Sequence, residues 1–255
     1  MFKISKYVIY GILRSKVIIA YTLFLLLITV GLFTFQNDVS KSIISIMSII
    51  MIMVPLVSII FSTTYFYNGY EFIELLLAQP LSRKTILLGE FTGIAISLIT
   101  AFLIGVGIPI VIYASTATGA VIIISGIALT LIFISLAILG SVATRDKAKG
   151  IGIALMLWFY FSIIYDAIIL GILFTFSDYP LDKAVILLAS LNPIDLGRII
   201  ILLKLDISAL MGFTGAVYKQ FFGSNFGLIY SITIMGVWII SPLFFAIRIF
   251  KRKNL

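Results

Sequence analysis

Residues 43–65 read IISIMSIIMIMVPLVSIIFSTTY, a run of 23 residues without a charged side chain. A helix needs about 20 apolar residues to cross the hydrocarbon core of a bilayer. Backbone N–H and C=O groups at that depth must find partners within the protein, so only helices or closed barrels can span. Barrel strands are short and alternate in polarity. This continuous run therefore predicts a transmembrane helix.

Five further apolar runs have the same character, and each is long enough to span. They are residues 17–35, 91–113, 121–143, 151–176 and 226–250. Of the 255 residues, 62% are hydrophobic and 11% are charged, whereas about a quarter of the residues in soluble proteins are charged. The sequence predicts an all-α integral membrane protein with six transmembrane helices, forming a single domain over residues 1–255.

The basic residues predict how the chain lies in the membrane. Lysine and arginine concentrate in cytoplasmic loops. With the N-terminus inside, 13 of the 18 basic residues fall on the inner side and 5 on the outer side. We predict an inner-membrane protein with both termini in the cytoplasm. The net charge of +8 is then a topology signal, and we expect no nucleic-acid partner.

The chain has no cysteine and no histidine. Disulfides, thiolate metal sites and the usual general base near neutral pH are therefore excluded. Met47, Met51 and Met53 invite a copper interpretation through their thioethers, but methionines in an apolar span are typically packing residues. No phosphate-binding loop of the G-x-x-x-x-G-K-[ST] type occurs. We expect no metal, no cofactor and no catalytic residues in this chain.

The inner loop at residues 69–85, GYEFIELLLAQPLSRKT, predicts a short helix. Ile73 and Leu77 share one face, and Glu71 and Glu74 share another. One interpretation is a surface helix with two solvated acids. The other is a helix that docks a cytoplasmic partner.

Local signals mark where this short helix ends and the next one begins. Pro80 disfavours helical geometry in the residue before it, and Ser82 is a good N-cap for the following span. The second inner loop, residues 144–150, contains Arg145 and Lys147. By itself this loop is an ordinary basic membrane anchor.

The first sixteen residues combine a basic side with an apolar side. Lys3, Lys6 and Arg14 lie on one side of a helix, and Ile4 and Val8 lie on the other. This pattern suits a helix in the membrane surface, and the alternative is a frayed basic tail.

Two features inside the spans attract notice. Asp166 is the only acid that we expect within a span, where a charge is costly unless it faces protein or water. It either belongs to a translocation path or is a packed, hydrogen-bonded or boundary acid near the outer surface. In the third span, small residues recur every four positions and favour close helix packing. They are Gly93, Ser97, Ala101 and Gly105.

The outer segment before the last span contains a strong helix start. Asn192 is a predicted N-cap, Pro193 occupies the first helical position, and Asp195 lies near the positive end of the helix dipole. The apolar pieces 193–204 and 209–222 are each too short to span. We expect a re-entrant or interfacial helical segment here.

These features together resemble the ABC type-2 permeases, which have six spans, short cytoplasmic loops and a broken outer segment. The stretch 74–90, ELLLAQPLSRKTILLGE, resembles the NosY-like subgroup, the membrane subunits of the transporter that matures nitrous oxide reductase. The outer stretches 191–198, LNPIDLGR, and 206–223 resemble the same subgroup.

The resemblance implies a permease that pairs with a second copy of itself and with two separate ATPase subunits, which bind and hydrolyse ATP. It implies a coupling helix over Glu71, Glu74, Leu77, Gln79 and Pro80, with Arg145 and Lys147 near a second one. It further implies a periplasmic accessory protein, and we expect that protein to contact the outer segment containing Asn192, Pro193, Asp195 and Arg198.

The function implied by the resemblance is the maturation of the copper cluster of nitrous oxide reductase. The chain would supply copper or sulfur, or transmit force to the periplasmic partner. Alternatives are an ABC type-2 exporter for another substrate and a secondary transporter that works without ATP. Secondary transporters usually place several ionisable groups in mid-membrane, whereas Asp166 is the only such group that we expect within a span of this chain. A membrane enzyme is disfavoured by the absence of histidine and cysteine.

Overall fold

The computed structural model describes residues 2–36, 38–176, 182–205 and 215–252, and within these ranges the chain forms helices and no strands. The helices are α1 (Phe2–Leu13), α2 (Lys16–Phe35), α3 (Val39–Asn68), α4 (Tyr70–Leu77), α5 (Arg83–Phe102), α6 (Ile108–Tyr113), α7 (Ala117–Ala143), α8 (Lys147–Phe159), α9 (Tyr165–Thr175), α10 (Asp182–Ser190), α11 (Pro193–Lys204), α12 (Gly215–Phe222) and α13 (Asn225–Arg252). Two π-helical turns, η1 (Leu103–Gly107) and η2 (Tyr160–Ile164), join α5 to α6 and α8 to α9.

The predicted six spans are present among the described residues. They are Lys16–Phe35, Val39–Asn68, Arg83–Tyr113, Ala117–Ala143, Lys147–Thr175 and Phe226–Arg252. The helices Ala184–Ser190 and Pro193–Lys204 form a pair bent by 113° before the last span. The expected all-α fold with six spans and a broken outer segment is confirmed. Of the expected apolar piece 209–222, residues 209–214 lie outside the described residues.

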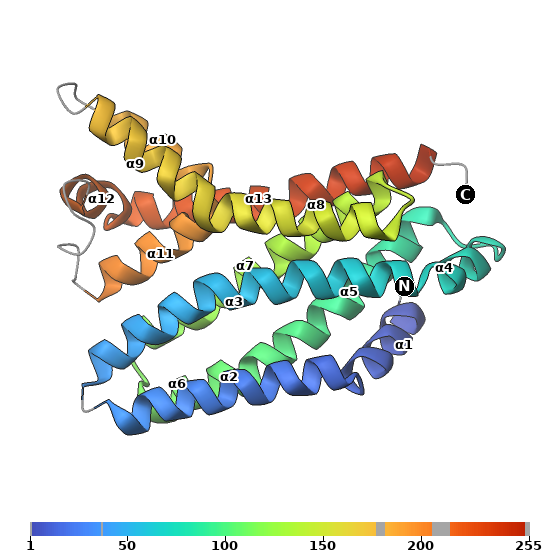
Figure 1. Cartoon of the computed structure of the whole chain (residues 1–255), viewed down its shortest axis with the longest axis horizontal. Coiled ribbons are helices and arrows are strands. Elements are labelled where there is room, and N and C mark those ends of the chain that lie inside the picture. The colour runs from blue at the N-terminus through green and yellow to red at the C-terminus, as the bar shows by residue number, and fades with distance from the viewer. Residues whose placement is uncertain (1, 37, 177–181, 206–214, 253–255) are drawn as a thin grey trace.

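Helix α7 lies at the centre of the bundle and packs against α3, α5, α11 and α13. Its most apolar stretch is 67% buried, whereas the corresponding stretches of α8–α9 and α13 are only 17% buried. Figure 1 shows the long helices running side by side. The apolar surfaces of the peripheral helices are left to lipid or to another subunit.

Helix α1 packs against α5 through glycines. A Cβ on Gly89 would lie 2.8 Å from Ile4 Cγ2, and one on Gly93 would collide with Val8. On α1, Ile4 and Val8 are buried and Lys3 is exposed, so α1 has the expected two-sided character. Because glycine has no side chain, the two helices approach closely.

The small residues of the third span pack against other helices of the same chain. Gly93 contacts α1, and a Cβ on Gly105 would lie 2.7 Å from Leu25 Cβ of α2. Ser97 and Ala101 are buried as well. The row therefore packs α5 and η1 against α1 and α2, and it gives no reason to expect a second copy there.

The two ends of the bundle carry different elements. Helices α1 and α4 and the last turns of α13 lie at one end, which we call the α4 end (Figure 1). Arg83 Nη1 donates to the Phe250 carbonyl oxygen at 3.1 Å, which joins the start of α5 to the end of α13. The turn between α2 and α3 and the helices α11 and α12 lie at the opposite end. The first and last described helices thus share one end, as the predicted topology requires.

Candidate functional site: the α4 end and the outer polar cluster

Helix α4 presents its acids outward. Ile73 and Leu76 are buried, while Glu71 and Glu74 are exposed. Leu77 is half-buried. Only Gly69 separates the last residue of α3 from the first residue of α4, so a displacement of α4 reaches α3 with little slack.

The end of α4 and the start of α5 lie close to where the sequence predicts them. The helix ends at Leu77, and Gln79 and Pro80 lie exposed in the turn that follows. The Ser82 side chain accepts a hydrogen bond from the Thr85 backbone N–H at 3.2 Å. Ser82 is therefore the N-cap of α5, as predicted.

The loop after α7 meets the end of α3, where the chain enters α4. The Tyr67 hydroxyl bonds to the Thr144 side chain and donates to the Ser141 carbonyl oxygen at 3.4 Å. Lys147 Nζ donates to Asn68 Oδ1 at 2.7 Å. The structure thus brings Lys147 and the neighbouring exposed Arg145 beside the helix that leads into α4. Sequence reasoning missed Tyr67 and Asn68, because nothing local shows that a span end will contact the second loop.

Helix α4 also contacts the N-terminal helix. The rings of Tyr7 and Phe72 stack with centroids 4.7 Å apart. Such pairs contribute about 0.5–1.5 kcal/mol beyond the burial of their area. A movement of α4 is therefore transmitted to α1 as well as to α3 and α5.

At the opposite end, residues that the sequence singled out for separate reasons form one cluster, which we call the outer polar cluster (Asp166, Asn192, Asp195 and Arg198). Arg198 Nη1 lies 3.0 Å from Asp166 Oδ2 and 3.2 Å from Asp195 Oδ1. Asp166 is thus a hydrogen-bonded acid at the end opposite α4, in agreement with the second of the two interpretations left open by the sequence. This ion pair joins α9 to α11.

Asn192 is the fully buried centre of the cluster. Its Oδ1 accepts the Ile194 backbone N–H at 3.0 Å, and Pro193 follows at the first helical position, so the predicted helix start is confirmed. Its Nδ2 donates to Asp195 Oδ2 and to the Phe161 carbonyl oxygen, both at 2.9 Å. Phe161 belongs to the π-helical turn η2. Asn192 therefore starts α11 and ties it to the fifth span.

The expectation that Asp166 is the only acid within a span is wrong. Glu90 lies in the span Arg83–Tyr113 and is 3% exposed. The apolar run that predicts this span begins at residue 91, but the helix starts directly after Ser82. Glu90 lies on the same helical face as the buried Ile86 and Ile94. Starting the helix at its predicted N-cap, Ser82, would have placed Glu90 within the span.

The described residues contain no group of three or more histidine, cysteine or acidic side chains that could hold a metal ion. Met47 and Met51 are buried in the apolar core, and the Met51 methyl group packs beside Gly197. In this setting the thioethers act as packing groups.

The architecture is that of a multi-pass membrane protein, and comparison with known proteins identifies its family. Residues 4–255 match the family described as "ABC-2 family transporter protein". The chain belongs to this family and is an ABC transporter permease, a membrane subunit that lacks a nucleotide-binding domain. Its family therefore implies separate ATPase partner subunits.

Two relatives carry the description "Probable ABC transporter permease protein NosY". The protein from Pseudomonas aeruginosa is 28% identical over 221 residues, which cover 78% of this chain and 80% of that protein. The protein from Stutzerimonas stutzeri is 26% identical over 231 residues, covering 85% and 82% of the two chains.

Proposed function

We propose that this chain is the membrane subunit of an ABC transporter that serves the maturation of the copper cluster of nitrous oxide reductase. The observation that carries the proposal is the similarity to two permeases described as NosY over about four fifths of the chain. The chain would act as one permease domain over residues 1–255. It would work with separate ATPase subunits that bind ATP, a second copy of itself and a periplasmic accessory protein.

A gene deletion tests this function. Nitrous oxide reductase purified from a strain lacking this chain should contain less copper and show less activity, and the intact gene should restore both. A reductase that matures fully without the chain would contradict the proposal. In that case the chain would be an ABC-2 permease for another substrate.

The mechanism proposed here starts at α4. Energy must enter from a separate ATPase, and α4 carries the exposed Glu71 and Glu74. We propose that these acids bind a basic or polar groove on the ATPase. Closure of the ATPase would then move α3 through Gly69, α8 through Tyr67 and Asn68, and α1 through the contact between Tyr7 and Phe72.

The double change Glu71→Ala and Glu74→Ala should weaken co-purification of the ATPase. Truncating one side of a desolvated charge pair costs about 2–5 kcal/mol of binding free energy. The matched control is Asp38→Asn, which removes an exposed acid at the opposite end and keeps a good N-cap residue for α3. If the double variant binds the ATPase as well as the control does, the acids are merely solvated.

We propose that the α4 end faces the cytoplasm. The basis is the inward bias of lysine and arginine. A reporter fused after the C-terminus should give a cytoplasmic signal, and one inserted near Thr118 should give an external signal. The reverse pattern would overturn the orientation.

Only some of the residues predicted to contact the periplasmic partner are accessible to it. Asn192, Pro193 and Asp195 are buried within this chain, so they are not available to a partner. Arg198 is half-buried, and Leu187 and Leu191 are 61% and 51% exposed. We propose that these three residues form the contact. Charge reversal at Arg198 would also disturb the cluster, so Leu187→Asp is the cleaner test of partner binding.

A further inference from the structure

A cavity of about 610 Å³ lies between α1, α2 and α3 near the α4 end. This volume is typical of small-molecule sites. The residues that line it are Gly11, Ser15, Val17, Leu56, Val57, Ile60, Phe61, Thr64, Tyr65 and Asn68. Nothing in the proposed coupling mechanism uses this cavity.

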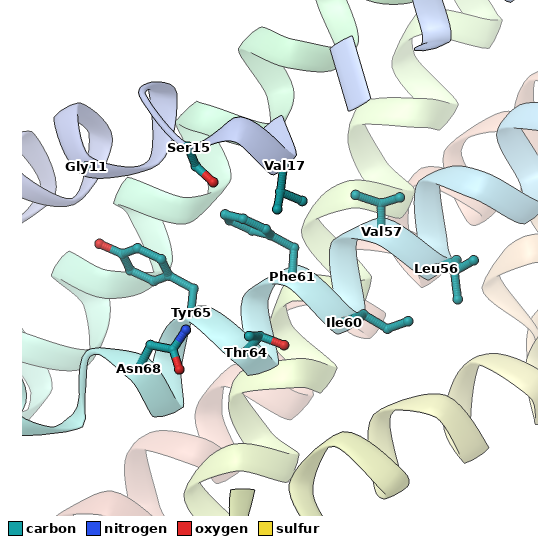
Figure 2. A pocket seen from close by; sticks show the side chains of 10 residues that line it. All are labelled: Gly11, Ser15, Val17, Leu56, Val57, Ile60, Phe61, Thr64, Tyr65 and Asn68. Carbon is teal, nitrogen blue, oxygen red and sulfur yellow. The ribbon is translucent and has the colours of Figure 1, made fainter. Parts of the chain in front are cut away.

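The cavity is polar at one end and apolar along its length. Figure 2 shows Tyr65 and Asn68 near the end of α3, and Leu56 and Val57 farther back along the same helix. The stretch of α3 from Leu56 to Asn68 rises about 18 Å. A bilayer core of about 30 Å gives each leaflet about 15 Å. The cavity therefore extends about as far as the acyl chain of one leaflet.

Two cations flank a residue that lines the cavity, and a third contacts another lining residue. Arg14 and Lys16 flank Ser15 in sequence, and both are exposed. Lys147 Nζ donates to Asn68 Oδ1 at 2.7 Å. Arg14 and Lys16 form no ion pair with another described residue. These two cations are thus available to an external anion.

We propose that the cavity binds one acyl chain of an anionic phospholipid, with the phosphate headgroup at Arg14 and Lys16. Anionic headgroups of the inner leaflet attract basic residues at the membrane surface. A second copy of this chain, packed through its own α2 and α3, fits the site less well because it would bring no acid to Arg14 and Lys16. Helix α2 contains no acid, and the only acid at the start of α3 is its N-cap Asp38, at the opposite end.

The bound lipid would join α1 to α3 beside the coupling helix. Gly11 of α1 and Tyr65 of α3 both line the cavity, so an acyl chain in it contacts both helices. Tyr7 of α1 also stacks on Phe72 of α4. The lipid would therefore stabilise the position of α1 against α4.

The test uses the full-length protein in nanodiscs containing equal amounts of phosphatidylglycerol and phosphatidylcholine with identical chains. After gentle delipidation, native mass spectrometry should find one phosphatidylglycerol retained per copy. Each basic residue near an anionic surface contributes roughly a fivefold factor in affinity. The double variant Arg14→Gln and Lys16→Gln should therefore retain phosphatidylglycerol roughly 25-fold more weakly.

Two control variants isolate the site. Lys41→Gln removes an exposed cation at the opposite end and should leave lipid retention unchanged. Ile60→Trp fills the cavity and should abolish retention, whereas Ile112→Trp, at a 69% exposed position on α6, should not. Equal retention of both lipids, or of phosphatidylglycerol in the cavity-filled variant, would overturn the proposal.

A last arm tests the alternative occupant. Because the chain has no cysteine, Ile60→Cys introduces a single thiol into the cavity wall. A disulfide between two copies in the membrane would show that a second copy covers the cavity, and the lipid proposal would then fail. Absence of such a disulfide is the expected result.

Discussion

At the opposite end of the molecule Arg198 binds Asp166 and Asp195, whereas Glu71 and Glu74 at the α4 end are exposed and form no ion pair within the described residues. Asn192 and Asp195 of the outer polar cluster are buried, so their polar groups must be satisfied internally. The acids of α4 keep their water and remain available to a partner. The acids of the outer polar cluster therefore hold α9 and α11 together, whereas those of α4 contribute no ion pair to the fold within the described residues.

The largest expected effect is at Asn192. Asn192→Ala should lower the free energy of unfolding by about 3 kcal/mol, because it removes an N-cap and leaves buried acceptors unsatisfied. Unfolding of the purified protein in mixed micelles measures this. The matched control is Asn68→Ala at the α4 end, where the asparagine is exposed. Equal losses for the two variants would remove the difference between the two ends.

Arg198→Ala should cost about 2 kcal/mol. Breaking a fully buried pair costs about 3–5 kcal/mol, and solvent screening lowers this because the Arg198 side chain is 36% exposed. A double-mutant cycle with Asp166→Ala should give a coupling energy of at least about 0.5 kcal/mol. Strict additivity of the two changes would show that the pair contributes nothing.

Gly93→Ala should cost about 1–3 kcal/mol by overpacking α5 against Val8 of α1. The matched control is Gly171→Ala in α9, where an added Cβ meets nothing within 4 Å. Alanine favours a helix more than glycine does, so the control should be neutral or slightly stabilising. A harmless Gly93→Ala would mean that α1 does not pack closely on α5.

The smallest effect on stability is expected for the double change Glu71→Ala and Glu74→Ala. Substitutions of exposed residues usually change the free energy of unfolding by less than about 0.5 kcal/mol. The same unfolding assay measures this, alongside the ATPase co-purification. A large loss of stability would show that the acids support α4 itself, and the difference between the two ends would disappear.

The six spans, the caps at Ser82 and Asn192, and the two-sided character of α1 were predictable from the sequence. Each depends on signals a few residues apart, such as apolar run length, helical spacing and a capping side chain. The exposure of Glu71 and Glu74 was predictable for the same reason. Glu90 was missed because the apolar run that predicted the span begins at residue 91, whereas the helix begins at Arg83.

Only the tertiary structure decided which of these residues meet. Asp166 and Arg198 are 32 positions apart, and Tyr67 and Thr144 are 77 apart. The small residues of the third span indicated close packing, but their partners proved to be α1 and α2 of the same chain. Periodicity tells which face of a helix is buried, and not which helix covers it. That depends on how all the spans pack together, and the cavity beside α1 exists only as a result of that packing.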